Sequence, residues 1–492
     1  MGGRRLTEPE ARARPRIERL SRYDLHCLAV ETPARPLHVG IRAVLDGRGL
    51  VDPAGRLRFA DIRLELDGRV AGVPQLRHVV VQPGRLAGRA LWLDDPAFRI
   101  DHHMREVEVP PPGDEAALLA LTERLMARPL DRSRPLWRIW FMTGLDGGRV
   151  GVLVILHHAL ADGLTAMRMV RSLLESPMAA GDPNPRAIPI AEGPPSRAEL
   201  VWDNVRSTIR SLRMLARPAT WRLALDVARA AWQTGSLARR SPSSSLNAPV
   251  GPRRRLATLR LDQRAAKRVA RAHGCGVNDV VLSLVAGGVR ALLDARGEPV
   301  GQLRPRVGIA VALFSPGHGR AAGNDIGTLH VPLPLADPDP GTRLPLIAAE
   351  RARAARSPMV ALEPIMRAWF GRIGRFRRSL EHQRLVNLAE TYVPGPPTPI
   401  DVLGARVLDL LPIAPLAGNL GLSFVAVSYA GRLTIAVRAD ADQFPDLDVL
   451  SAAMERDWHA LVGPVTPVAP VPTVAQRNGA WETPRVPAAS AV

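Results

Sequence analysis

The sequence predicts an α/β protein made of two halves, each with a mixed sheet flanked by helices. Two observations support this class. Valine-rich runs bounded by proline or glycine alternate with helical runs between residues 16 and 176, and the alternation returns between residues 256 and 463. A connector rich in proline and serine separates the two regions at residues 177–255. Because ligands often bind between packed halves, we expect an active site at the interface.

The first half begins with three strand-like runs at residues 36–47, 76–83 and 105–111. Asp114 is a suitable N-cap, and the leucines that follow it at helical spacing predict an amphipathic helix. Two apolar runs then flank Asp-Gly-Gly, which predicts a hairpin because glycine accepts the positive φ of such turns. The second arm of this hairpin runs into "VGVLVILHHALADG", residues 151–164.

The connector contains a basic amphipathic region at residues 200–233. Apolar residues recur there at steps of three and four, and the other face carries Arg206, Arg210, Arg213, Arg217, Arg222 and Arg229. This pattern is typical of a helix on a membrane surface and equally of helices packed on their own protein. The sequence leaves both interpretations open.

The second half again mixes predicted strands with predicted helices. The strand-like runs are "RVGIAVALF", "IGTLHVPLPL" and "LGLSFVAVSYAGRLTIAVRAD", and the helical runs are "QRAAKRVARAHG" and "VNDVVLSLVAGGVRALLDARG". From residue 464 the chain is rich in proline and alanine, which predicts disorder. We therefore expect a flexible tail (1–15), a first subdomain (16–176), the linker (177–255), a second subdomain (256–463) and a disordered tail (464–492).

The charge balance favours an anionic partner. The chain has 66 basic and 47 acidic residues, a formal charge of +19 that attracts phosphates of lipids or cofactors. Nucleic acid is disfavoured, since aromatic residues are only 4% and the arginines are scattered. Two cysteines build no disulfide framework. With no apolar run of about 18 residues and no signal peptide, we expect a cytoplasmic protein that can attach peripherally to the inner membrane face or to lipid droplets.

Two adjacent histidines are the strongest candidates for chemistry. His157 and His158 follow a strand that is apolar on both faces, so their rings lie at the edge of a core where a general base can be desolvated and oriented. Asp162 is placed to fix local geometry at the start of a helix, and Gly163 to allow close backbone approach. A metal would need a third ligand nearby, and neither cysteine is local. From composition alone, catalysis and a structural role are both possible.

A second histidine pair occurs in "IDHHM", where His102 and His103 match the Asp-His-His signature of metal-dependent phosphoesterases. That chemistry needs further carboxylates at strand ends. The flanking sequence offers only Asp94, Asp95 and Glu106 in a loop-like setting. We expect no metal site there.

The stretch "HHALADG" has the His-His-three residues-Asp-Gly form of the CoA-dependent acyltransferase superfamily, whose members resemble chloramphenicol acetyltransferase and include condensation domains. The surrounding chain resembles one branch, the bacterial wax ester synthase/acyl-CoA:diacylglycerol acyltransferase family. The stretches that carry this resemblance are "RLSRYDLHCLAVETPARPLHVG", "LWLDDPAFRIDHHM", "PLDRSRPLWRIWFMTGL", "VNDVVLSLVAGGVRALLDARGE", "GNDIGTLHVPLP" and residues 393–446. They cover nearly the whole chain apart from the tails and linker.

The resemblance implies two chloramphenicol acetyltransferase-like subdomains with a tunnel at their interface. Acyl-CoA would enter as the donor substrate, no cofactor would be bound tightly, and the acceptor would be diacylglycerol or a fatty alcohol. His158 would be the general base, with His157 in support, Asp162 orienting the loop and Gly163 permitting its geometry. Asn278 and Asp279 match the family's Asn-Asp pair and are candidates for site support, although Asn278 could equally cap the start of a helix.

The chain departs from the family pattern twice in its second half. Thr391 and Tyr392 stand where the family usually has Ser-Asn, and "IAVALFSPG" (309–317) lacks the expected serine and arginine. Two alternatives therefore accompany the acyltransferase hypothesis. One is a stand-alone condensation-type acyltransferase of a specialised lipid or peptide pathway, and the other is a lipid-surface homologue with weakened chemistry.

Overall fold

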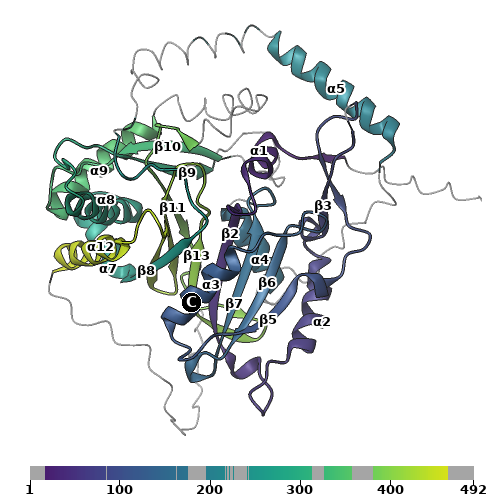
Figure 1. Cartoon of the computed structure of the whole chain (residues 1–492), viewed down its shortest axis with the longest axis horizontal. Coiled ribbons are helices and arrows are strands. Elements are labelled where there is room, and N and C mark those ends of the chain that lie inside the picture. The colour runs from purple at the N-terminus through teal and green to yellow at the C-terminus, as the bar shows by residue number, and fades with distance from the viewer. Residues whose placement is uncertain are drawn as a thin grey trace, which may run out of the picture.

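The computed structural model describes residues 17–84, 86–161, 163–174, 195–216, 243–312, 326–356 and 381–463, with positions 218, 221, 225 and 241. Two six-stranded sheets and one three-stranded sheet form its framework (Figure 1). The predicted class, an α/β fold with two sheet-containing halves, is confirmed. The small sheet, β1 (Glu18–Arg19), β4 (Leu91–Asp94) and β3 (His78–Val81), lies beside the first half.

The first large sheet is built on the predicted hairpin. Its order is β12 (Asp401–Val402), β13 (Ala405–Ile413), β2 (His38–Asp46), β7 (Arg149–His157), β6 (Trp137–Thr143) and β5 (Met104–Glu108). Gly147 and Gly148 take φ of 65° and 66° at the turn between β6 and β7, as the hairpin requires. β7 is buried from its second residue to its last, which explains its continuous apolar sequence.

Different helices cover the two faces of this sheet. α2 (Phe59–Val70) and α4 (Gly163–Leu174) pack on one face. α3 (Glu115–Met126) packs on the other, where its leucines also meet Leu256 and Ala436 of the second sheet. α3 therefore lies between the two sheets (Figure 1). It starts after Asp114, whose carboxylate accepts the Ala117 N–H at 2.8 Å, as predicted.

The second large sheet has the order β10 (Ile326–Pro332), β9 (Arg306–Ala312), β11 (Leu388–Pro394), β14 (Leu422–Tyr429), β15 (Arg432–Asp440) and β8 (Arg254–Asp262). Four helices cover its outer face: α7 (Gln263–Ala272), α8 (Val277–Ala295), α9 (Pro340–Ala355) and α12 (Leu447–Val462). α8 is the most buried of these, because nearly every residue along "VVLSLVAGGV" is fully covered. This accounts for its apolar sequence all around the helix.

The chain crosses between the sheets within its second half. β12 and β13 were expected to belong to the subdomain at residues 256–463, yet β13 pairs antiparallel with β2 of the first sheet. Its apolar residues Val407 and Leu410 then join the core under α2 and α4. This strand of the second half thus completes the first sheet, since a strand's sheet is chosen by a partner more than 350 residues away rather than by its own sequence.

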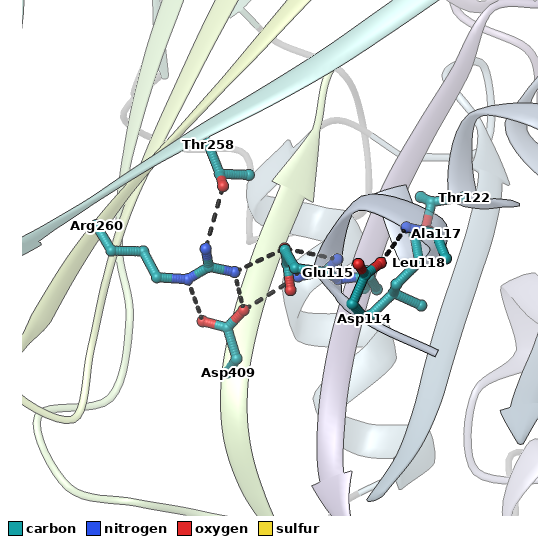
Figure 2. A network of polar contacts seen from close by, with 9 residues as sticks. Asp114, Glu115, Ala117, Leu118, Thr122, Thr258, Arg260 and Asp409 are labelled. Atoms are coloured by element: carbon teal, nitrogen blue, oxygen red, sulfur yellow. Dashed lines mark hydrogen bonds and ion pairs between the residues drawn. The ribbon is translucent and has the colours of Figure 1, made fainter. Parts of the chain in front are cut away.

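A polar network joins the two sheets beside α3 (Figure 2). Arg260 of β8 donates to Asp409 of β13 and to Glu115 of α3, each at 2.8 Å. Arg42 of β2 is fully buried and donates to both of these carboxylates at 3.1 Å. One guanidinium from each sheet thus shares the same two acids, which ties the sheets together by charge-assisted hydrogen bonds.

Helix α5 (Arg197–Leu215) is attached to the first half mainly through its first turns. Arg19 donates to the Leu200 carbonyl at 2.9 Å and to Asp203 at 2.6 Å, and Leu200 packs in a small apolar cluster. Farther along, apolar side chains are exposed: Trp202 57%, Val205 38%, Ile209 44% and Leu212 60%. The helix therefore carries an outward apolar stripe that nothing in the described chain covers.

Candidate active site

The two candidate histidines lie where β7 ends, facing the start of β2. His157 is the last residue of β7 and pairs with His38, the first residue of β2. His158 follows, and its N–H donates to the Leu37 carbonyl at 2.9 Å. The backbone before His158 and its own N–H are thus held against Leu37 and His38, which gives the ring a fixed base.

His157 is buried and fixed by hydrogen bonding. Its side chain is almost fully covered, and its Nδ1 accepts the Ala159 N–H at 2.9 Å. The ring proton of neutral His157 is therefore on Nε2, which lies 3.2 Å from Glu31 Oε2. The ring cannot reach a substrate without displacing its neighbours, so its role is to support the loop.

Glu31 is the anionic centre behind the histidines, and the sequence analysis did not single it out. It accepts the Leu37 N–H at 3.1 Å and the Arg132 guanidinium at 2.7 Å. Burial opposes the charged form, but the contacts with His157, Arg132 and Leu37 outweigh it and lower the Glu31 pKa from 4.5 to about 2. Glu31 is thus ionised at neutral pH and holds both β2 and the His157 ring.

His38 completes the buried cluster, although the sequence alone gave no reason to assign it a role. It is fully covered, its Nδ1 donates to the Met126 carbonyl at 3.1 Å, and its Nε2 lies 3.6 Å from Glu31. Burial lowers the His38 pKa to about 4, so the ring is neutral at pH 7. Glu31 and His38 share the stretch "ETPARPLHVG", but their meeting with His157 depends on the pairing of β2 with β7.

His158 differs from His157 in its exposure. Its ring is partly exposed and meets the Tyr23 ring of α1 (Arg22–Val30) edge-on, with centroids 5.5 Å apart. Of the two neighbours, His158 alone combines a fixed backbone with access from outside. Such a ring can take a proton from a bound hydroxyl.

The rest of the motif is only partly described. Asp162 lies outside the described residues. Gly163 begins α4, and a side-chain carbon added there would meet no described atom within 4 Å. Its φ is not positive either. The described atoms therefore give no steric reason for glycine, and the close backbone approach at this position stays a prediction.

Asn278 and Asp279 lie at the start of α8, where Gly276 is the N-cap. Asp279 accepts the Gly276 N–H at 2.8 Å and pairs with Arg351, so it stabilises the helix start. Asn278 donates to Glu390 of β11 at 3.4 Å, and burial raises the Glu390 pKa to about 8. No hydrogen bond within the described chain links either residue to the histidines. Asp279 thus caps the start of α8, and site support by either residue stays a prediction.

The divergent second-half residues also have defined places. Thr391 and Tyr392 are in β11, and the Tyr392 hydroxyl lies 3.4 Å from Ser428 Oγ. Residues 309–312 finish β9, whereas 313–317 lie outside the described residues.

In the "IDHHM" stretch, His103 is buried between the Phe98 and Trp137 rings. Among the described residues, no group of three His, Cys, Asp or Glu side chains is arranged to hold a metal ion.

Comparison with known proteins identifies the family of the chain. The chain matches the family model of the wax ester synthase/diacylglycerol acyltransferase catalytic domain over residues 20–281, and that of the WS/DGAT C-terminal domain over residues 322–461. The chain belongs to the wax ester synthase/diacylglycerol acyltransferase family. This WS/DGAT protein is therefore an acyltransferase, and the predicted resemblance is confirmed.

Individual relatives agree with the family. A Mycobacterium tuberculosis H37Rv protein named "Putative diacyglycerol O-acyltransferase" is 30% identical over 474 residues, which cover 91% of this chain and 90% of the relative. Another from that strain, named "Probable diacyglycerol O-acyltransferase tgs1", is 29% identical over 75% of this chain and 80% of its own.

Solved structures show the same fold. The wax ester synthase/diacylglycerol acyltransferase of Marinobacter aquaeolei VT8 has a TM-score of 0.63 at 21% identity, covering 90% of this chain and 98% of its own. The starter condensation domain of rhizomide synthetase, solved as a mutant with C8-CoA, has a TM-score of 0.57 at 17% identity, covering 91% and 94%. The WS/DGAT protein thus shares its two-sheet architecture with condensation domains.

Proposed function

We propose that this WS/DGAT protein transfers a long-chain fatty acyl group from acyl-CoA to the hydroxyl of diacylglycerol or a fatty alcohol. The observation that carries the proposal is the pair of neighbouring histidines with opposite surroundings. His157 is locked behind the strand end by Glu31, while His158 keeps a fixed backbone and an accessible ring. The acyl donor is supported by the related condensation domain solved with C8-CoA.

The reaction needs one proton relay and no covalent enzyme intermediate. His158 removes the proton of the acceptor hydroxyl as its oxygen attacks the thioester carbonyl. The carbon–sulfur bond then breaks, and the proton passes from the imidazolium to the CoA thiolate. A base held in this way contributes roughly a hundred- to ten-thousandfold in rate. Asp162 is proposed to orient the loop, and Gly163 to leave room beside it.

The test is acyl transfer by the purified His158→Ala variant. We expect release of CoA from palmitoyl-CoA with diacylglycerol or hexadecanol to fall by at least roughly a hundredfold, with an unchanged melting temperature. His459→Ala, at an exposed position on α12, is the control for loss of a histidine. Turnover at the wild-type rate by His158→Ala would contradict the assignment of His158 as the general base. Turnover of carrier-linked donors in preference to acyl-CoA would instead support the condensation-type alternative.

We also propose that α5 attaches the protein peripherally to an anionic membrane or lipid-droplet surface. The exposed stripe of Trp202, Ile209 and Leu212 has an interfacial character, and neighbouring arginines favour anionic headgroups. No single described helix is long and apolar enough to cross a membrane. A cytoplasmic enzyme working at a lipid surface would meet its apolar acceptors there.

Flotation with phosphatidylglycerol vesicles tests this attachment. The triple variant Trp202→Ser/Ile209→Ser/Leu212→Ser is expected to lower the vesicle-bound fraction at least fivefold. The matched control is Leu64→Ser/Leu346→Ser/Val449→Ser, which changes exposed apolar residues on other helices. Equal flotation of both triple variants would show that α5 does not attach the protein to the vesicles, and would favour the interpretation that it packs on its own protein.

A further inference from the structure

Three arginines gather on the face of the first sheet that carries the His157 ring. Arg138 of β6 pairs with Ile155 of β7, and His157 lies two residues farther on the same strand. Alternate residues of a strand share a face, so Arg138 and His157 point to the same side. Arg105 of β5 pairs with Trp140, two residues along β6 from Arg138, and so shares this face.

The third member, Arg128, follows α3 and reaches the same place. Its guanidinium lies over the Trp140 ring, 5.3 Å from the ring centroid. Arg105 and Arg128 are exposed, whereas Arg138 is half-buried. The cluster of Arg105, Arg128 and Arg138 therefore forms a cationic patch in which Arg138 is the least exposed member.

Nothing anionic neutralises this cluster in the described part of the chain. No carboxylate there forms an ion pair with any of the three arginines, and Arg105 donates only to the backbone carbonyls of Asp101 and Met104. The buried Nε of Arg138 has no hydrogen-bond partner among the described residues. The one acid that favours its charge, Asp131, already pairs with Arg134 at 3.3 Å and accepts from Ser133.

The charged form of Arg138 is disfavoured by its surroundings. Burial and the charges of Arg105 and Arg128 together lower the Arg138 pKa. Like charges held this close repel, and the buried Nε donor of Arg138 is left without a partner among the described residues. A multiply charged anion would remove both penalties, because arginine forks match phosphate oxygens.

We propose that Arg105, Arg128 and Arg138 bind the phosphate groups of the CoA donor. The inference rests on the proposed acyl-CoA chemistry and adds where the donor is held. His158 comes directly after His157, the last residue of β7, and lies roughly 10 Å along the chain from the level of Arg138. The pantetheine arm that joins the phosphates to the thioester is long enough to span this separation.

Kinetics with two thioesters test the assignment. Palmitoyl-CoA carries the phosphates, and palmitoyl-N-acetylcysteamine has the same thioester without them. In Arg138→Met and in the double variant Arg105→Met/Arg128→Met, we expect the KM for palmitoyl-CoA to rise at least tenfold with kcat within twofold. The loss with the truncated thioester should be at least fivefold smaller. Arg268→Met, an exposed arginine on α7, is the charge-matched control.

Calorimetry separates failure of this site from failure of the proposed reaction. Binding of CoA and of adenosine 3′,5′-bisphosphate is expected to weaken at least tenfold in Arg138→Met at an unchanged melting temperature. That result supports the site even in a protein that fails to transfer acyl groups. Unchanged CoA binding, or equal losses with both thioesters, overturns it. If flotation with phosphatidylglycerol vesicles is lost while CoA binding persists, the cluster binds lipid headgroups instead.

Discussion

Neighbouring histidines acquire different properties from their surroundings rather than from their shared motif. At the strand end, His157 is buried against Glu31 and His158 remains accessible. In "IDHHM", His103 lies between two aromatic rings at centroid distances of 5.3 and 4.3 Å, and its Nδ1 donates to the Trp137 carbonyl at 2.9 Å. His103 is thus a structural residue of the core.

This burial makes His103 sensitive to acid. Desolvation, with contributions from Arg138, His102 and Arg134, lowers the His103 pKa from 6.5 to about 4. Between these values the unfolded chain binds the proton and the folded chain does not, so stability is lost as pH falls. In wild type this residue alone should lower the free energy of unfolding by about 1–2 kcal/mol between pH 7 and pH 5.

His103→Phe should remove that part of the pH dependence, because phenylalanine keeps the ring stack and does not titrate. Urea unfolding at pH 7 and pH 5 measures the difference for wild type and variant. His38, whose pKa is also about 4, keeps its own contribution of the same sign in both proteins. His459→Phe, at an exposed site, is the control. A variant that loses as much stability as wild type on acidification would contradict the assignment.

Helices and turns were predictable from the sequence where their signals lie within a few residues of them. The hairpin of β6 and β7 and the start of α3 at Asp114 follow from glycine and capping signals within a few residues. The start of α1 carries a local signal of the same kind, since Ser21 and Asp24 form a capping box. The sequence analysis did not use this signal. These signals act through the backbone next to them and need no distant partner.

The candidate site shows the limit of that information. His157 and His158 stand out because both follow one apolar strand. Glu31 could not be found in the same way, since it reaches His157 only after β2 pairs with β7. Arg105, Arg128 and Arg138 likewise meet only when β5, β6 and the end of α3 are assembled. Sequence spacing locates the reactive group, and tertiary pairing supplies its electrostatic surroundings.

On the scale of the whole molecule, the two halves are not independent units. The chain leaves β11 of the second sheet, adds β12 and β13 to the first, and returns to the second sheet at β14. The network in Figure 2 joins the sheets beside this crossing. We therefore expect both sheets to unfold in one cooperative transition.

The network predicts unequal effects of its members on stability. Asp409→Asn leaves Arg42, which is fully buried, with Glu115 as its remaining anionic partner. Uncompensated buried charge typically costs about 3–5 kcal/mol, so a loss near the lower end is expected. Arg260→Met removes a side chain that is 31% exposed and leaves both acids paired with Arg42, so about 1 kcal/mol is expected.

Urea unfolding followed by tryptophan fluorescence and by circular dichroism measures both losses and tests the single transition. Asp401→Asn is the matched control, because its pairing with Arg406 on the neighbouring strand is exposed, and it should cost less than about 0.5 kcal/mol. Equal losses for Asp409→Asn and Arg260→Met would show that the burial of Arg42 does not govern the network. Separation of the two optical transitions in Asp409→Asn alone would instead show that this charge maintains the coupling between the sheets.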